Sequence, residues 1–199
     1  MENLVENISK SVAIELLFEE MPTRPTANAI FREARKIFGD INIINRDEND
    51  IEFSVDKFVA YNEDNTTSPV VLAMGNITDF DDKVAVSEFE RTQIWNVANS
   101  EELLSKYKYA VKIWDVNAQR QIPKERAIML VDWLNVALKL YPKCQAIWIK
   151  SAGKLQLAQS IKNLKETGIV KYLYSMVNIR FFNVPNTNEF IVDSVGLAN

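Results

Sequence analysis

The side chains most often used for catalysis and metal binding are nearly absent from this chain. Its 199 residues include no histidine and a single cysteine, Cys144. Without an imidazole group, the protein cannot use a Ser-His-Asp or Cys-His mechanism, and it cannot hold zinc through histidine. A chain of this length can lack histidine by drift, so the absence limits the mechanism without excluding activity. The carboxylates are left as candidates for acid–base or metal chemistry.

The densest group of carboxylates is the cluster Asp79, Asp81 and Asp82. Carboxylate oxygens are the ligands that Ca²⁺ and Mg²⁺ prefer. The spacing does not match a twelve-residue calcium loop, which needs a central glycine and a terminal glutamate. Acidic residues also favour the first turn of a helix, and a helix is expected to follow here. We therefore interpret the cluster as a solvated loop and predict no metal site and no cofactor.

A second arrangement of carboxylates involves two expected strands. Glu15 lies on the first strand, followed by Glu19 and Glu20, and Asp115 occupies a comparable place on a later strand. Two carboxylates that meet across a sheet can act as general acid and base. Glu15 alternates with apolar residues, however, and this pattern places it on a solvent-facing side of its strand. The carboxylate pair is thus an alternative hypothesis, which requires the side chains to converge in space.

Nucleotide-binding motifs are missing from the sequence. Ser151, Gly153 and Lys154 lie together, but the Gly-x-x-x-x-Gly-Lys spacing of a phosphate-binding loop is not present. No Gly-x-Gly-x-x-Gly occurs in a chain with five glycines. The segment around Gly153 is expected to be a turn from a strand to a helix.

Aromatic residues beside lysines indicate a contact surface more than a reaction centre. Trp and Tyr are enriched at protein interfaces, and the segments 106–114 and 171–174 combine them with lysine. The alternative is that most of these side chains pack in the core. The predicted partner surface consists of Tyr107, Tyr109, Trp114, Tyr172 and Arg180.

Hydrophobic periodicity predicts the elements that position these residues. Apolar residues alternate with polar ones over 12–18 and 51–55, which is typical of strands, and recur at helical spacing after Pro25 and Pro123. The helix after Pro123 has two apolar stripes, so we expect it to be central. The expected elements are strand 12–18, a helix from Pro25 to Gly39 with Thr23 or Arg24 near its cap, strands 51–55, 58–61 and 70–74, helices 86–95 and 100–106, strand 107–116, a helix from Pro123 to Pro142, strand 144–149, a helix from Leu157 to Gly168, and a hairpin of 177–184 with 189–192.

This order of elements predicts an α+β fold with a mixed, largely antiparallel sheet packed by helices. Residues 1–199 are expected to form a single domain. The segments 11–75 and 107–195 each contain a strand–helix–strand unit, and a helical connector over 84–106 joins them. Side-chain identity between the two segments is weak, so both an ancient duplication and a coincidence of common units remain open.

Three stretches carry a family resemblance. The segment 92–116 contains Gln93, Trp95 and Asn96, the segment 177–182 reads Val-Asn-Ile-Arg-Phe-Phe, and 193–197 reads Asp-Ser-Val-Gly-Leu. Together they resemble the bacterial family catalogued as domain of unknown function 4261, whose closing strand precedes a similar Gly-Leu signature. The resemblance implies an intracellular bacterial α+β domain without an established reaction, and it supplies no catalytic residues.

Within this resemblance, Arg180, Asp193 and Gly196 merit inspection. We expect Arg180 to pair with Asp193 or Asp115, or alternatively to bind an acidic partner peptide. Gly196 is expected to permit a turn with positive φ.

Composition limits the partners and the compartment. The net charge of −4 and the pI near 5.1 argue against binding to nucleic acid, which usually needs a basic face. No apolar stretch approaches the ~20 residues of a membrane span, and the first ten residues lack the features of a secretory signal. With only one cysteine, we predict a cytoplasmic protein.

The leading functional hypothesis is a non-enzymatic bacterial binding or accessory factor, immunity-like in character, whose partner is another protein. The alternatives are a carboxylate-dependent hydrolase, with or without Mg²⁺, and a structural subunit of a larger assembly.

Overall fold

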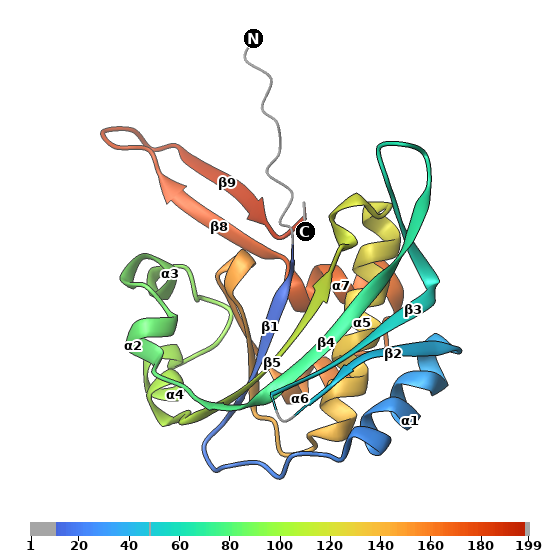
Figure 1. The fold of residues 1–199 in the computed structure, drawn as a ribbon. Helices are drawn as coiled ribbons and strands as arrows, with labels where there is room; N and C mark the ends of the chain where they lie inside the picture. Colours follow the sequence, from blue (N-terminus) through green and yellow to red (C-terminus); the bar gives the residue numbers. More distant parts are fainter. Residues whose placement is uncertain (1–10, 48, 198–199) are drawn as a thin grey trace.

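The computed structural model describes residues 11–47 and 49–197, and its main feature is a seven-stranded antiparallel sheet (Figure 1). The strand order is β2-β3-β4-β5-β1-β6-β7, and β8 and β9 form a separate two-stranded sheet. Helices pack on the large sheet, which confirms the predicted α+β class. The prediction that residues 1–10 lack a secretory signal concerns residues outside the described part.

The strands are β1 (Ala13–Phe18), β2 (Ile41–Arg46), β3 (Asp50–Tyr61), β4 (Thr67–Asp79), β5 (Tyr109–Val116), β6 (Ala146–Ile149), β7 (Lys154–Leu157), β8 (Asn178–Asn183) and β9 (Phe190–Val195). The helices are α1 (Ala27–Phe38), α2 (Asp82–Ala85), α3 (Glu88–Thr92), α4 (Ser100–Lys106), α5 (Pro123–Leu140), α6 (Ala158–Asn163) and α7 (Gly168–Met176).

The main core lies between one face of the sheet and the helices α1, α5, α6 and α7 (Figure 1). Helix α5 is central, as its two apolar stripes predicted, and Trp133 on this helix is fully buried. The Trp133 indole packs edge-on against Phe53 and donates a hydrogen bond of 3.2 Å to the Ala73 carbonyl. The bond gives the only polar atom of this buried side chain an acceptor. The indole can therefore hold α5 on the sheet without the cost of an unsatisfied N–H group.

The second core covers the opposite face of the sheet beneath the short helices α2, α3 and α4. Leu17 of β1 and Trp148 of β6 belong to it, together with Val86 and Leu104 from the helical segment. The helical connector expected over 84–106 is therefore a packing layer. It also places residues 89–95 beside the β8–β9 hairpin.

Several predicted boundaries are corrected by the structure. Helix α1 begins at Ala27 because the Thr26 side chain caps it, accepting a hydrogen bond from the Ala29 amide. The single helix predicted over 86–95 is wrong. Within this range only α3 is helical, because Val86 is extended and Ser87 starts α3 with a capping box that includes Glu90, and α2 lies before the predicted range.

Towards the C-terminus, the helix expected to end at Gly168 spans only α6, and Gly168 begins α7. Strands β2 and β7 and helices α2 and α7 were not predicted. Strand β2 lies at the edge of the sheet and exposes Ile43 and Ile44, so it lacks a clear alternation of buried and exposed residues.

The two strand–helix–strand units occupy different positions in the sheet. The strands β1 and β5 are antiparallel neighbours at its centre. Strand β6 lies directly beside β1, whereas β2 lies beyond β5, β4 and β3. The connection from β5 to β6 therefore passes over one strand, β1. The connection from β1 to β2 passes over three strands, β5, β4 and β3. Among the residues that the structure describes, no helix combines the length and the apolar character needed to cross a bilayer.

Candidate protein-binding surface

The β8–β9 hairpin projects from the body of the protein and is the feature that most resembles a binding site (Figure 1). Its two strands pair in register from Asn178–Val195 to Asn183–Phe190. Within the described part of the chain, neither strand has a second neighbouring strand. An isolated two-stranded hairpin is only marginally stable in water, so other contacts must support it.

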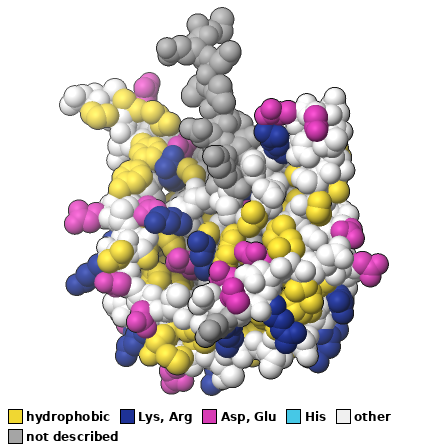
Figure 2. Space-filling model, viewed as in Figure 1, with side chains coloured by type: hydrophobic (Ala, Val, Ile, Leu, Met, Phe, Trp, Pro, Cys, Tyr) yellow, Lys and Arg dark blue, Asp and Glu magenta, His cyan; other side chains and the backbone are white. Residues whose placement is uncertain are grey.

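Apolar side chains occupy both faces of this hairpin. Phe181 and Val192 lie opposite each other on one face, and Phe182 and Ile191 lie opposite each other on the other face. The side chains that we call the hairpin surface are each 47–63% exposed: Phe89, Trp95, Ile179, Phe181, Phe190, Ile191 and Val192. Yellow side chains gather over this region at the upper left of Figure 2. The face of Phe182 and Ile191 also carries the Arg180–Asp193 pair, whereas the face of Phe181 and Val192 is apolar and exposed, and this pattern indicates a surface that is covered by something else.

The base of the hairpin is anchored to the body by hydrogen bonds. Trp95 Nε1 donates to the Ile179 carbonyl at 2.9 Å, and the Trp95 ring packs edge-on against Phe181. The Tyr172 hydroxyl donates to the Gly196 carbonyl at 2.5 Å just after β9. Asn178 Nδ2 donates to the Gly153 carbonyl at 3.0 Å. These three bonds fix where the hairpin leaves the body, and among the described residues its tip makes no such bond to the body.

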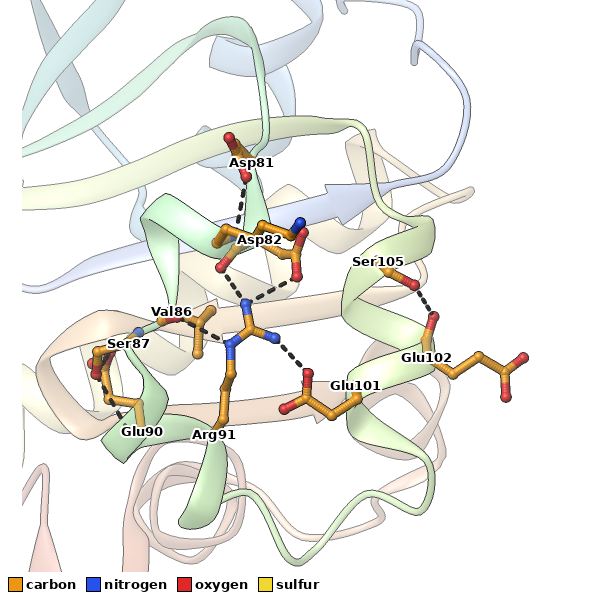
Figure 3. Close-up of polar contacts among 10 residues, drawn as sticks. Asp81, Asp82, Val86, Ser87, Glu90, Arg91, Glu101, Glu102 and Ser105 are labelled. Atoms are coloured by element: carbon orange, nitrogen blue, oxygen red, sulfur yellow. Dashed lines mark hydrogen bonds and ion pairs between the residues drawn. The ribbon is translucent and has the colours of Figure 1, made fainter.

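The helical segment that supports the hairpin is held by Arg91 (Figure 3). Its guanidinium donates to the Asp82 carboxylate at 2.9 Å, to the Glu101 carboxylate at 2.7 Å and to the Val86 carbonyl at 3.2 Å. Burial opposes the charge, but the hydrogen bonds to both carboxylates outweigh it and raise the pKa of Arg91. Arg91 thereby joins α2, α3 and α4. This arrangement positions Phe89, whose ring stacks on the ring of Phe182 with 6.3 Å between the ring centroids.

Arg180 and Asp193 form an ion pair across the hairpin, which confirms the predicted pairing. Arg180 Nε donates to Asp193 Oδ1 at 2.8 Å, and a second, shorter bond joins Nη2 to Oδ2. The hydrogen bond from Arg180 lowers the pKa of Asp193. Gly196 has φ +100°, as expected for a turn that favours glycine. The Arg180 guanidinium also lies over the Phe182 ring, so both members of the ion pair have their partners within the hairpin.

The other predicted surface residues do not lie on the exposed hairpin. Tyr107 and Tyr172 are buried, with 4% and 2% exposure. Tyr109 is half-buried against the main core, and Trp114 lies half-buried beneath Lys112 on the sheet. Only Arg180 belongs to the hairpin. The aromatic residues of the hairpin surface, Phe89, Trp95, Phe181 and Phe190, were not selected by sequence reasoning.

The candidate catalytic carboxylates do not converge. Asp115 is fully buried against α5, where Arg126 Nε donates to it at 2.7 Å. Glu15 lies on the other face of the sheet, as Leu17 does, and burial raises its pKa against the opposing effect of Lys112. The sheet itself separates these two carboxylates. No pair at the separation of acid–base catalysis is formed between them.

The acidic cluster has structural roles. The Asp81 side chain caps α2, Asp82 bonds to Arg91, and Asp79 ends β4. Over the described residues, no group of three or more acidic or cysteine side chains is arranged to hold a metal ion. Cys144 is buried, and burial raises the pKa of its thiol to about 12. A thiol in that state is a poor nucleophile.

Searches of family models, curated proteins and solved structures found no match to this chain.

Proposed function

We propose that this protein is a non-enzymatic binding factor whose partner is another protein docked on the hairpin surface. The observation that carries the proposal is the exposure of four apolar side chains, Ile179, Phe181, Phe190 and Val192, on one face of a hairpin that has no further neighbouring strand in the described part of the chain. Four half-exposed aromatic side chains and three aliphatic ones present on the order of 500 Å² of apolar area. This area suits the centre of a standard interface, which covers about 800 Å² on each partner.

The outer edge of β9 is where we place the partner's backbone. The Val184 amide donates to the Glu189 carbonyl at 3.0 Å, and bonded and non-bonded pairs alternate along an antiparallel ladder. By this alternation the amides of Phe190, Val192 and Ser194 point away from β8. Trp95 bonds to the corresponding outer carbonyl of β8 at Ile179, so β9 is the more open edge. A partner strand added there would gain main-chain hydrogen bonds and cover the apolar side chains.

The other expectations are consistent with this role. The net charge of −4 favours a partner with a basic surface, as in immunity-like complexes, through faster association. A lone buried thiol suits a reducing compartment, and we place the protein in the cytoplasm. The resemblance to domain of unknown function 4261 supports a bacterial protein, and its closing motif falls on β8 and β9.

The proposal is tested by capture from the native host followed by binding measurements with the captured partner. Val192→Pro removes only an outward amide, and Val192→Ala serves as its side-chain control. Phe181→Ser with Phe190→Ser removes apolar surface, and Ile44→Ser on the distant edge strand β2 is a matched control because it is 55% exposed. We expect Val192→Pro and the double variant to weaken binding at least about tenfold, Val192→Ala to weaken it less than Val192→Pro does, and Ile44→Ser to bind nearly normally.

Equal binding by all four variants would refute the docking site. Concentration-dependent self-association that Val192→Pro abolishes would identify a second copy as the occupant and overturn the assignment to a different protein.

A further inference from the structure

The two faces of β9 differ in polarity along its outer edge. Side chains alternate between the faces of a strand, so Phe190 and Val192 share one face, and both are exposed. Ile191 and Asp193 lie on the opposite face, where Arg180 of β8 pairs with Asp193. A strand added at this edge would therefore meet apolar side chains on one face and a carboxylate on the other.

Glu189 adds a second carboxylate to the face of Asp193. The Glu189 carbonyl accepts the Val184 amide at 3.0 Å, so the paired ladder extends one residue before β9 and the alternation of faces holds there. The Glu189 side chain is exposed, and among the described residues no cation forms an ion pair with it. Glu189 and Asp193 are four residues apart, which corresponds to about 13 Å along an extended strand. Two cations four residues apart on a partner strand would have the same spacing.

Asp193 can accept a second cation even though it is paired with Arg180. Its side chain remains 39% exposed, and each carboxylate oxygen can accept more than one hydrogen bond. A strand added to the sheet lies about 4.8 Å from β9, whereas Arg180 lies on the far side of β9, on β8. The partner's side chains on this face therefore meet the carboxylates of Asp193 and Glu189 before they meet Arg180. This arrangement favours cations in the partner.

We infer, resting on the proposed docking of a strand at β9, that the partner presents an extended segment with the pattern Lys/Arg-Φ-x-Φ-Lys/Arg, where Φ is aromatic or β-branched. The two Φ side chains lie opposite Phe190 and Val192, because cross-strand pairs of these types are favourable. The two cations lie opposite Glu189 and Asp193, and their aliphatic stems cover the exposed Ile191 between them. The pattern is the same in both directions, so it holds for a parallel and for an antiparallel partner strand.

NMR titration of the whole protein with two designed peptides tests this pattern. The matching peptide is acetyl-Thr-Lys-Val-Thr-Val-Lys-Thr-amide. The shifted peptide, acetyl-Thr-Val-Lys-Thr-Lys-Val-Thr-amide, has the same composition and charge but places its lysines opposite the apolar face. We expect the matching peptide to bind with a Kd below about 1 mM and the shifted peptide to bind at least about fivefold more weakly. The matching peptide should also slow hydrogen exchange of the outward Phe190 and Val192 amides.

Glu189→Gln removes one of the two carboxylates and tests the charge pairing directly. Because the Glu189 side chain is exposed, this variant should keep its Tm, so a loss of binding cannot be attributed to unfolding. At low salt, we expect its affinity for the matching peptide to fall about two- to fivefold, as for an exposed ion pair. In about 1 M salt the difference should disappear, since salt screens exposed charges. Glu20→Gln, on an exposed glutamate just after the end of β1, is the control and should bind normally.

Three results would overturn the inferred pattern: no binding of the matching peptide at about 1 mM, the expected upper limit of its Kd, equal binding of the two peptides, or unchanged affinity in Glu189→Gln at low salt. The docking of a partner at β9 is tested separately, by the effect of Val192→Pro on the captured partner. If Val192→Pro weakens that partner and the peptides bind equally, the docking site stands and the pattern alone is wrong. If Val192→Pro has no effect on that partner, the docking site itself is wrong.

Discussion

Replacing Arg126 with methionine should strongly destabilise the protein, because it leaves Asp115 as a buried charge without its cationic partner. The side chains of both residues are 2% exposed or less. Arg126 Nε bonds to Asp115 Oδ2 at 2.7 Å and Nη2 bonds to Oδ1 at 3.2 Å. The Val12 amide also donates to Asp115 at 2.6 Å, so the carboxylate joins α5, β5 and the start of β1.

The expected magnitude follows from what remains after the substitution. Methionine replaces most of the aliphatic stem of Arg126, so little packing is lost. One hydrogen bond, from the Val12 amide, still stabilises the Asp115 carboxylate, but the positive charge is gone. Removal of one partner from a buried ion pair costs about 3–5 kcal/mol. Domains of this kind are stable by only about 5–15 kcal/mol, so the variant loses a large part of its stability.

The double variant Asp115→Asn with Arg126→Met separates charge from packing. Asparagine keeps an acceptor for the Val12 amide but has no charge to leave uncompensated. We expect the double variant to be more stable than Arg126→Met alone by at least about 1.5 kcal/mol. If Arg126→Met does not fold, Arg126→Lys keeps the positive charge and allows a smaller loss to be measured.

Urea denaturation followed by tryptophan fluorescence measures these differences, and Arg120→Met is the matched control. Arg120 makes an ion pair of 2.6 Å with Glu63, but the two side chains are 44% and 87% exposed. Removal of an exposed pair should cost no more than about 1 kcal/mol. If Arg126→Met and Arg120→Met cost the same, or if the double variant is less stable than Arg126→Met, the explanation by a buried charge is wrong.

Three further predictions concern titration and the support of the hairpin. Hydrogen bonds from Lys139 and Lys36 lower the pKa of Glu33 to about 2 from 4.5, so this group contributes stability above pH 4.5 that is lost as the pH falls towards 2. Glu33→Gln should flatten the pH dependence of unfolding in that range, and NMR titration of the carboxyl group checks the pKa. Burial lowers the pKa of Lys154 to about 8 from 10.5, so the unfolded chain binds more protons between these values and stability should rise with pH there. That rise should be absent from Lys154→Met in denaturation curves at pH 8 and 10. Arg91→Met should cost about 1–2 kcal/mol and increase hydrogen exchange in residues 82–106, whereas unchanged exchange would show that Arg91 does not join the three short helices.

The strands and helices that could be predicted from the sequence are those with a strong periodic pattern. The alternation from Val12 to Phe18 and the two apolar stripes after Pro123 correspond to β1 and α5. The closing hairpin was also predicted, because two apolar runs flank a turn that contains Pro185 and Asn186. Strands β2 and β7 were not predicted. Strand β2 is an edge strand that is mostly exposed, and β7 has only four residues, so neither has a clear alternation of buried and exposed positions.

The candidate site could be predicted only in part. The aromatic composition led to the hypothesis of a contact surface, but it could not distinguish the buried Tyr172 from the exposed Trp95. The Tyr172 side chain is buried and its hydroxyl bonds to the Gly196 carbonyl after β9, whereas Trp95 bonds to Ile179 of β8 and stays 55% exposed. The signal available for the hairpin was a run with apolar residues at both even and odd positions. Such a run normally indicates a strand buried on both faces.

The sequence by itself determined the class of fold and the chemistry that is excluded. Periodicity and residue types are local properties, and they established an α+β chain without histidine. Which side chains face one another is decided by the order and spacing of strands in the sheet, because this order brings distant segments together. The tertiary structure therefore decided that Glu15 and Asp115 lie on opposite faces of the sheet. It also decided that Phe181 and Phe190 remain 49% and 63% exposed, because Phe89 and Trp95 cover only part of the hairpin.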